Sequence, residues 1–244
     1  MSMEFPNESS EYRAARERLL AKEVELRRLT ESVAAARREL PPGGLLKEDY
    51  IFDEANANGD FAKTKFSELF ARGSGSLLVY NFMFPRDPED DRPPSTGSAT
   101  RRLMLAEQPC PSCVGLLDQL DGAARHATQR LNFVIVAKTS IATLHTFGKE
   151  RGWTHLRLLS ASGNTFKRDY GGESAEGAQR PMMNVFERNG GEIRHFWSSE
   201  MLYAPTDSGQ DPRHMGTLEP LWNLFDLTRE GRPADWQEQL GYPR

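Results

Sequence analysis

Residues 110–127 have the sequence CPSCVGLLDQLDGAARHA, which begins with two cysteines three positions apart. The apolar residues behind them recur at helical spacing, namely Val114, Leu116, Leu117, Leu120, Ala123, Ala124 and Ala127. Proline is well tolerated in the first turn of a helix, so Pro111 fits a helix that starts beside Cys110. The stretch therefore predicts an amphipathic helix with Cys110 near its N-cap and Cys113 in its first turn.

Two apolar runs of strand length flank this helix. Residues 76–84 contain Leu77 to Tyr80 and Phe82 in nearly unbroken order, and residues 131–137 follow the helix. Such continuous runs are typical of strands that are buried on both faces. The three segments together predict a strand, helix, strand unit around the cysteines.

The remaining segments extend this pattern in both directions. We expect strands at 49–52, 156–159, 182–187 and 192–197, and helices at 66–70, 140–151 and 217–225. The short helix at 66–70 is expected to be capped by Ser67 or Thr64, and Asn189-Gly190-Gly191 predicts a hairpin turn. Strands that alternate with helices and end in a hairpin predict an α/β layer fold, a mixed sheet flanked by helices.

The N-terminal segment predicts a long helix over residues 12–40, which lack Gly and Pro and are rich in strong helix formers. An apolar residue recurs every seventh position at Tyr12, Leu19, Leu26, Val33 and Leu40. Such a seam packs either against a second copy of the chain or against its own domain, and both alternatives stay open. Pro41 to Gly44 then end the helix. We expect an arm at 1–44, a homodimer contact through 12–40, and one domain at 45–244.

An insertion at about 85–108 precedes the cysteines. Four prolines and a cluster of acidic residues lie between Pro85 and Ser98. This composition excludes regular structure and predicts a mobile loop, which would serve as a lid or as a contact for a partner.

Charge and hydropathy exclude several classes of partner. The chain has 31 Lys and Arg against 35 Asp and Glu, and a net charge of -4 is too balanced for a nucleic-acid groove or an anionic membrane patch. No stretch approaches the roughly 20 apolar residues of a membrane span, and the first ten residues lack the pattern of a signal peptide. We therefore expect a cytoplasmic protein that binds neither nucleic acid nor membrane.

The two cysteines are the only ones in the chain, so their chemistry is local. Near a helix start, the free amide hydrogens and the helix dipole stabilise a thiolate. Cys110 is therefore the predicted nucleophile, and Cys113 the thiol that resolves a mixed disulfide. Pro111 and Ser112 lie between them and are expected to support the site by setting its redox poise.

The cysteine pair has two other interpretations. It could be half of a zinc site, but a second cysteine pair is missing and the five histidines form no close ligand pair. It could also be an inert pair of small buried side chains. We expect no metal and no cofactor.

A Cys-x-x-Cys beside a strand, helix, strand unit resembles the active site of thioredoxin-like proteins. Pro181 strengthens the likeness, because it stands directly before a strand that leads into a hairpin. In thioredoxin-like proteins that place holds a cis proline facing the thiols, so the resemblance implies a cis bond before Pro181. The alternative is an ordinary proline at the start of a strand.

The resemblance extends to a bacterial thioredoxin-like family catalogued as domain of unknown function eight-nine-nine. The matching stretches are Phe66 to Phe70, Leu78 to Phe84, Cys110 to Cys113, Arg151 to Trp153, Ser160 to Gly163, Phe166 to Tyr170, and Phe225 to Thr228 with Gly231 and Arg232. The helix 12–40 and the Leu40-Pro41-Pro42 break are similar to the opening of the family. Membership implies a thioredoxin-like fold and a dithiol/disulfide oxidoreductase. The insertion before Cys110 is longer than this family leads us to expect.

Three functions remain as hypotheses. The first is a thiol/disulfide oxidoreductase that acts on a protein or small-molecule disulfide through Cys110 and Cys113. The second is a peroxide reductase, since residues 67–85 resemble the early strand and helix of peroxiredoxins, although their Thr-x-x-Cys pattern is missing. The third is a non-catalytic dimeric binding module on the same scaffold.

Overall fold

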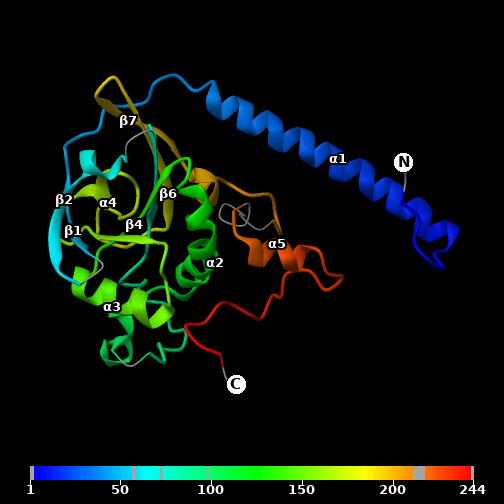
Figure 1. The fold of residues 1–244 in the computed structure, drawn as a ribbon. Helices are drawn as coiled ribbons and strands as arrows, with labels where there is room; N and C mark the ends of the chain where they lie inside the picture. The colour runs from blue at the N-terminus through cyan, green and yellow to red at the C-terminus, as the bar shows by residue number, and fades with distance from the viewer. Residues whose placement is uncertain (1–2, 57–58, 72–73, 98, 211–217, 243–244) are drawn as a thin grey trace. The chain divides into compact units, whose positions relative to one another are not determined.

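The fold is taken from a computed structural model and is described over residues 3–56, 59–71, 74–97, 99–210 and 218–242. The chain divides into two compact units, Met1–Pro42 and Gly43–Arg244 (Figure 1). Among the described residues, no helix is both long and apolar enough to cross a lipid bilayer.

The first unit consists mainly of one long helix, α1 (Ser10–Arg38). Its N-terminus is capped by Ser9, whose hydroxyl accepts a hydrogen bond from the backbone N–H of Tyr12 at 3.1 Å. Basic residues occupy its last turn, where they complement the helix dipole. The predicted N-terminal helix is confirmed, with both ends two residues earlier than expected.

The second unit is built on a seven-stranded mixed sheet with the order β2-β1-β5-β4-β3-β6-β7. Its strands are β1 (Ile51–Ala55), β2 (Phe61–Lys65), β3 (Ser76–Asn81), β4 (Asn132–Ala137), β5 (Arg157–Ser160), β6 (Met182–Asn189) and β7 (Glu192–Ser198). The three central strands β3, β4 and β5 run parallel, and the outer pairs are antiparallel. The predicted mixed sheet flanked by helices is therefore confirmed.

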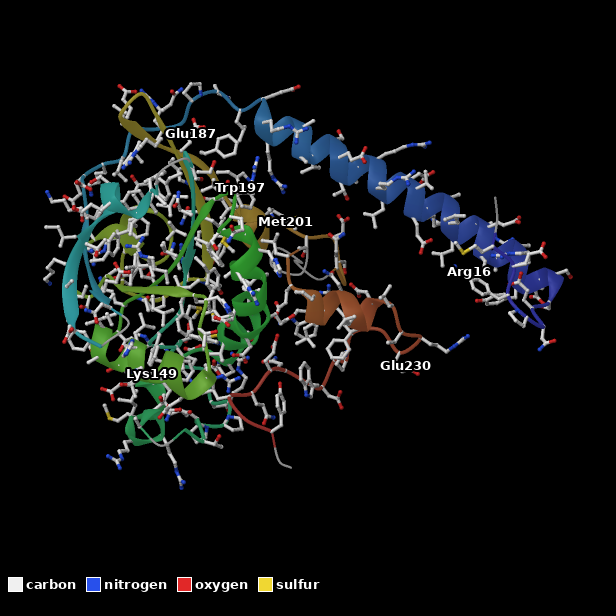
Figure 2. The ribbon with its side chains drawn as sticks, in the orientation of Figure 1. Arg16, Lys149, Glu187, Trp197, Met201 and Glu230 are labelled. Atoms are coloured by element: carbon white, nitrogen blue, oxygen red, sulfur yellow. The ribbon has the colours of Figure 1, made fainter. Side chains whose placement is uncertain are left out.

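Helices cover both faces of the sheet. Alternate residues of a strand point to opposite faces, so Tyr80 packs with α2 (Pro111–Ala127) and α3 (Ile141–Arg151), whereas Val79 packs on the other side. The second face is covered by the 3₁₀ turn Phe66–Leu69 and the short helix α4 (Phe166–Asp169). Figure 2 shows side chains filling the space between α2 and the strands.

Some elements differ from the sequence-based expectation. The hairpin partner β2 was not predicted, because its residues are largely exposed and lack a clear alternation of apolar side chains. The closing helix α5 is Pro220–Asp226, and the predicted start at Thr217 lies outside the described residues. Neither Thr64 nor Ser67 caps the helix at 66–70, since Thr64 binds Glu54 and Ser67 binds Asp49. The carboxylate of Glu68 instead accepts from the backbone N–H of Lys65 at 2.8 Å.

The Pro-rich part of the insertion has no helix or strand over the described residues 85–97, as its prolines suggested, but 3₁₀ turns follow at Thr100–Arg102 and Leu105–Glu107. Polar contacts attach the insertion to the rest of the unit. The side-chain oxygen of Gln108 accepts from the backbone of Ser95 at 2.7 Å. The carboxylate of Glu150 accepts from the backbone of Ala99 and the hydroxyl of Thr100. These polar groups thus find partners within the unit, and the mobility of the segment stays a prediction.

The prediction of a cis bond before Pro181 was wrong. The cis peptide bond found in the described residues joins Phe84 to Pro85, at the start of the insertion. The backbone N–H of Arg180 donates to Gly172 at 3.0 Å, and Pro181 directly precedes β6. Pro181 therefore fits the alternative of an ordinary proline at the start of a strand, which the sequence pattern satisfies equally well.

Candidate functional site: the thiol pair at the start of α2

The backbone after β3 places Cys110 at the start of α2. The N–H of Cys110 donates to the carbonyl of Met83 at 2.9 Å, which fixes the helix start against the end of β3. Cys110 is the N-cap residue of α2, and Pro111 occupies its first turn. This position directs the free amide hydrogens of the helix toward the first sulfur.

The two thiols are free and differ in acidity. The thiol of Cys113 donates a hydrogen bond to the sulfur of Cys110, and this is the largest cause that lowers the pKa of Cys110 from 9.0 to about 7. The backbone N–H of Cys113 also faces that sulfur and lowers its pKa, without forming a regular cap hydrogen bond. The same pairing, together with burial, raises the pKa of Cys113. The pair therefore holds its negative charge on Cys110.

A guanidinium from the insertion lies against the thiolate position. Arg92 places Nη2 at 3.6 Å from the Cys110 sulfur and donates through Nη1 to the hydroxyl of Ser112 at 2.7 Å. Asp90 binds the same guanidinium in bidentate fashion, at 2.6 and 2.8 Å. The positive charge of Arg92 lowers the pKa of Cys110, and the negative charge of Asp90 raises it. Asp90 thus holds the Arg92 guanidinium beside the Cys110 sulfur, but its negative charge offsets part of the pKa lowering that Arg92 causes.

A second group of contacts surrounds Cys113. The hydroxyl of Tyr80 donates to its sulfur, and so does the backbone N–H of Met83, and both lower its pKa. Cys113 is 3% exposed and Tyr80 1% exposed, so these donors act in an environment with little water. Donors of this kind favour the thiolate form of Cys113.

The C-terminal segment closes the site from the other side. Ser112 donates to the carboxylate of Glu238 at 3.1 Å. A side-chain carbon at Gly115 would come within 3.0 Å of Glu238, so glycine permits this close approach. Further along α2, Gln119 donates to the carboxylate of Glu219 at 3.1 Å. Burial and the charge of Glu238 raise the pKa of Glu219 to about 7.

The structure brings together four of the five residues named from the sequence. Cys110, Pro111, Ser112 and Cys113 form one turn. The fifth, Pro181, has no described contact with either sulfur. Its carbonyl accepts from the hydroxyl of Tyr203 at 2.9 Å. Burial raises the pKa of Tyr203, and the charge of Cys113 adds a smaller contribution in the same direction. Pro181 is thus connected to the thiol pair through Tyr203 and not by a described contact of its own.

Sequence reasoning missed the residues that bind the sulfurs from outside the motif. Tyr80 was placed in a buried strand, but its hydroxyl contact was not predicted. Asp90 and Arg92 belong to a segment whose composition suggested only a loop. Arg101 and Arg102, the arginines that lie nearer to Cys110 in sequence, are exposed. Among the described residues, no group of three or more His, Cys, Asp or Glu is arranged to hold a metal ion.

Comparisons with solved structures found matches at low sequence identity and with TM-scores below 0.5. Peroxidoxin BcpB from Mycobacterium tuberculosis is 12% identical with a TM-score of 0.43, over 75% of this chain and 96% of that chain. A peroxiredoxin Q variant from Xanthomonas campestris is 11% identical with a TM-score of 0.43, over 75% and 96%. The exposed lipoprotein thioredoxin Etrx1 from Streptococcus pneumoniae is 13% identical with a TM-score of 0.37, over 70% and 99%.

No curated protein matches the sequence. The family model described as "Bacterial protein of unknown function (DUF899)" matches residues 2–243, which is nearly the whole chain. The resemblance inferred from the Cys110 motif and the later landmarks is thereby confirmed. The chain belongs to the DUF899 family of bacterial proteins.

Proposed function

We propose that the protein is a dithiol/disulfide oxidoreductase in which Cys110 attacks and Cys113 resolves. The observation that carries this proposal is the unequal acidity of two adjacent thiols, with the pKa of Cys110 lowered to about 7 and that of Cys113 raised. An inert structural pair needs no such asymmetry, because buried cysteines in apolar surroundings keep a raised pKa. Arg92, which contacts the Cys110 sulfur, adds a positive charge where the thiolate forms.

The two cysteines together supply the two electrons that reduce the substrate disulfide. The Cys110 thiolate attacks one sulfur of a substrate disulfide, forms a mixed disulfide and releases the other substrate sulfur as a thiolate. Cys113 then loses its proton and attacks the Cys110 sulfur, which releases the second substrate thiolate. The substrate gains two electrons and two protons, and the chain ends as the Cys110–Cys113 disulfide. A thiol or dithiol reductant reverses this oxidation.

The burial of Cys110 limits how a substrate reaches it. The residue is 6% exposed, and Arg92 and Asp90 of the insertion lie beside it. A small-molecule disulfide, or a protein disulfide in an extended segment, would reach this sulfur after a shift of the Arg92 side chain. A disulfide buried within a folded partner would not. We therefore place small or extended disulfides first among the substrates.

Single-cysteine variants test the assignment. Reduction of insulin and of oxidised glutathione would be followed in the wild type and in Cys110→Ser and Cys113→Ser. We expect both variants to lose turnover, and only Cys113→Ser to accumulate a mixed disulfide, because it retains the nucleophile. Arg101→Gln, at an exposed position without a described contact to either sulfur, keeps both thiols and serves as the control. Trapping on Cys113 in the Cys110→Ser variant, or equal slow alkylation of both thiols near neutral pH, would contradict the proposal.

A peroxide reductase is the second candidate, and the low exposure of Cys110, 6%, favours it over a reductase of large substrates. Hydrogen peroxide is smaller than any disulfide substrate, and Arg92, which contacts the Cys110 sulfur, could donate to it. The Cys110 thiolate would attack one peroxide oxygen and become a sulfenic acid, while the other oxygen leaves as hydroxide and is protonated to water. The Cys113 thiol would then condense with the sulfenic acid to form the Cys110–Cys113 disulfide and a second water. Parallel measurement of peroxide consumption and disulfide reduction separates the two enzymes. Activity in neither assay would favour the non-catalytic binding module.

A further inference from the structure

Lys167 is a buried lysine that the proposed reaction has not yet used. It lies in α4, on the face of the sheet opposite α2, and its side chain is 0% exposed. Its Nζ donates to the carbonyl oxygen of Phe82 at 2.6 Å. Burying an ammonium group is costly unless a charge compensates it. The buried ammonium group of Lys167 therefore needs a negative group nearby to compensate its charge.

No carboxylate within ion-pair distance of Lys167 is found in the described part of the chain. Glu173 lies near enough to influence it, but that carboxylate is bound to Lys138 at 3.1 Å and to Arg168 at 3.4 Å. The other negative group that acts on Lys167 is the sulfur of Cys113. Glu173 is thus already paired with two other cations, whereas Cys113 is not. The Cys113 sulfur is therefore the negative group that can compensate the charge of Lys167.

One peptide group joins the two residues. The carbonyl of Phe82 accepts from Lys167, and the N–H that follows it, on Met83, donates to the sulfur of Cys113. These two atoms belong to the same planar amide. A positive charge on the carbonyl oxygen polarises the amide and strengthens its N–H as a donor, because linked hydrogen bonds reinforce one another. The charge of Lys167 is thus transmitted to Cys113 through the Phe82–Met83 peptide.

We propose that Lys167 is a positioning residue for the resolving step, which stabilises the Cys113 thiolate through the Phe82–Met83 peptide group. The inference rests on the proposed dithiol chemistry and assigns this lysine to its second half. Lys167 touches neither sulfur. Cys110, whose attack comes first, draws its donors from Arg92 and Cys113 instead.

The protons balance in this scheme. Burial lowers the pKa of Lys167 to about 7, and the charge of Cys113 opposes that shift. Ionisation of Cys113 therefore raises proton affinity at Nζ, so that the interior gains an ion pair and not a lone charge. When the Cys113 thiolate attacks and forms the new disulfide, the proton held at Nζ of Lys167 passes to the leaving substrate thiolate or to water. The other groups that act on the two residues are Cys110, Tyr80, Glu173 and Lys138.

The disulfide reagent dithiobis(nitrobenzoate) separates attack by Cys110 from resolution by Cys113, because the chain contains no other cysteines. Attack by Cys110 releases one thionitrobenzoate, and attack by Cys113 on the resulting mixed disulfide releases a second. In Lys167→Met we expect the first release to stay within about twofold of the wild type. We expect the second to slow by about tenfold, with its pH midpoint about one unit higher.

Two further variants make the result decisive. Lys167→Gln is neutral but can still donate to Phe82, so it should slow the second release like Lys167→Met if the charge is responsible. Lys138→Met removes a neighbouring charge that does not bind Phe82, and it should change the second release by less than about twofold. A second release in both Lys167 variants as fast as in the wild type would overturn the inference.

The same assay distinguishes this inference from the function on which it rests. If the wild type releases one equivalent only, or if Cys113 reacts first, the dithiol function itself fails. If the wild type releases two equivalents in the expected order and the Lys167 variants match it, only the role of Lys167 fails. A slowing of both releases by a similar factor would indicate a merely structural role and would also reject the proposal.

Discussion

Arg92 is the charged side chain that contacts the Cys110 sulfur, and its removal should change the acidity of that thiol. In Arg92→Gln we expect the pKa of Cys110 to rise from about 7 by about one unit, because the favourable charge is lost and Asp90 remains. The thiolate fraction at pH 7 would then fall from about one half to about one tenth. Thiolate absorbance in the ultraviolet, followed against pH in the wild type and in Arg92→Gln, measures this change, because the raised pKa of Cys113 keeps its titration apart.

The control for this experiment comes from the same segment. Arg101 is exposed and has no described contact with either sulfur, so Arg101→Gln should leave the titration unchanged. An unchanged titration in Arg92→Gln would show that the sulfur owes its acidity to Cys113 and the helix start alone. A general effect of net charge would shift both variants equally.

The residue scale also shows what a sequence can and cannot reveal about a site. Cys110 and Cys113 were identified because their spacing and the helix behind them are local features. Arg92 and Lys167 were not assigned a role, since charged residues are mostly exposed and burial depends on contacts made far along the chain. Lys167 lies within the Phe166 to Tyr170 stretch that carried the family resemblance, which was the available hint of its importance.

At the scale of elements, the C-terminal segment is fastened to α2 by carboxylates, and this makes its stability depend on pH. Glu219 is 4% exposed, and its pKa is raised from 4.5 to about 7 by burial and by Glu238. A raised pKa means that the folded state holds this proton more tightly than the unfolded state. The stabilisation is therefore complete below about pH 4.5 and is lost as the pH rises toward 7.

Glu219→Gln should remove this dependence, because an amide stays neutral and can still pair with Gln119. Relative to the variant, the wild type should lose on the order of 2 kcal/mol of stability between pH 4.5 and 7.5. Urea unfolding of both proteins across that range measures the difference. Glu230→Gln, at an exposed position, is the control. Parallel stability curves for the wild type and Glu219→Gln would contradict the raised pKa.

The elements themselves were predictable to different degrees. Segments with a strong apolar pattern, such as β4 and α2, were found close to their observed limits. The strand β2 was missed because its side chains are mostly exposed and leave no periodic signal. The pairing of β1 with β5 joins residues more than a hundred positions apart, and single-sequence patterns carry no information on such contacts.

At the scale of the whole molecule, the unit Met1–Pro42 contains neither cysteine but carries an exposed seam of apolar side chains. Taken by itself, α1 buries none of its residues. The seam residues Tyr12, Leu19, Leu26, Val33 and Leu40 are between 41% and 64% exposed. Fully burying a leucine is worth roughly 1.5–3 kcal/mol, so a seam of this length favours association with an apolar partner. We propose that the partner is the same helix of a second chain.

Leu26→Glu tests this pairing in the full-length protein. A charge in the centre of the seam should convert a dimer to a monomer in light scattering, because two carboxylates would face each other in an apolar interface. Arg27→Glu introduces the same side chain one position off the seam and should leave the mass unchanged. Thionitrobenzoate release should be equal in all three proteins, since both cysteines belong to the other unit. A wild type with the mass of one chain would refute the pairing, whereas equal masses for the wild type and Leu26→Glu would place the dimer contact elsewhere.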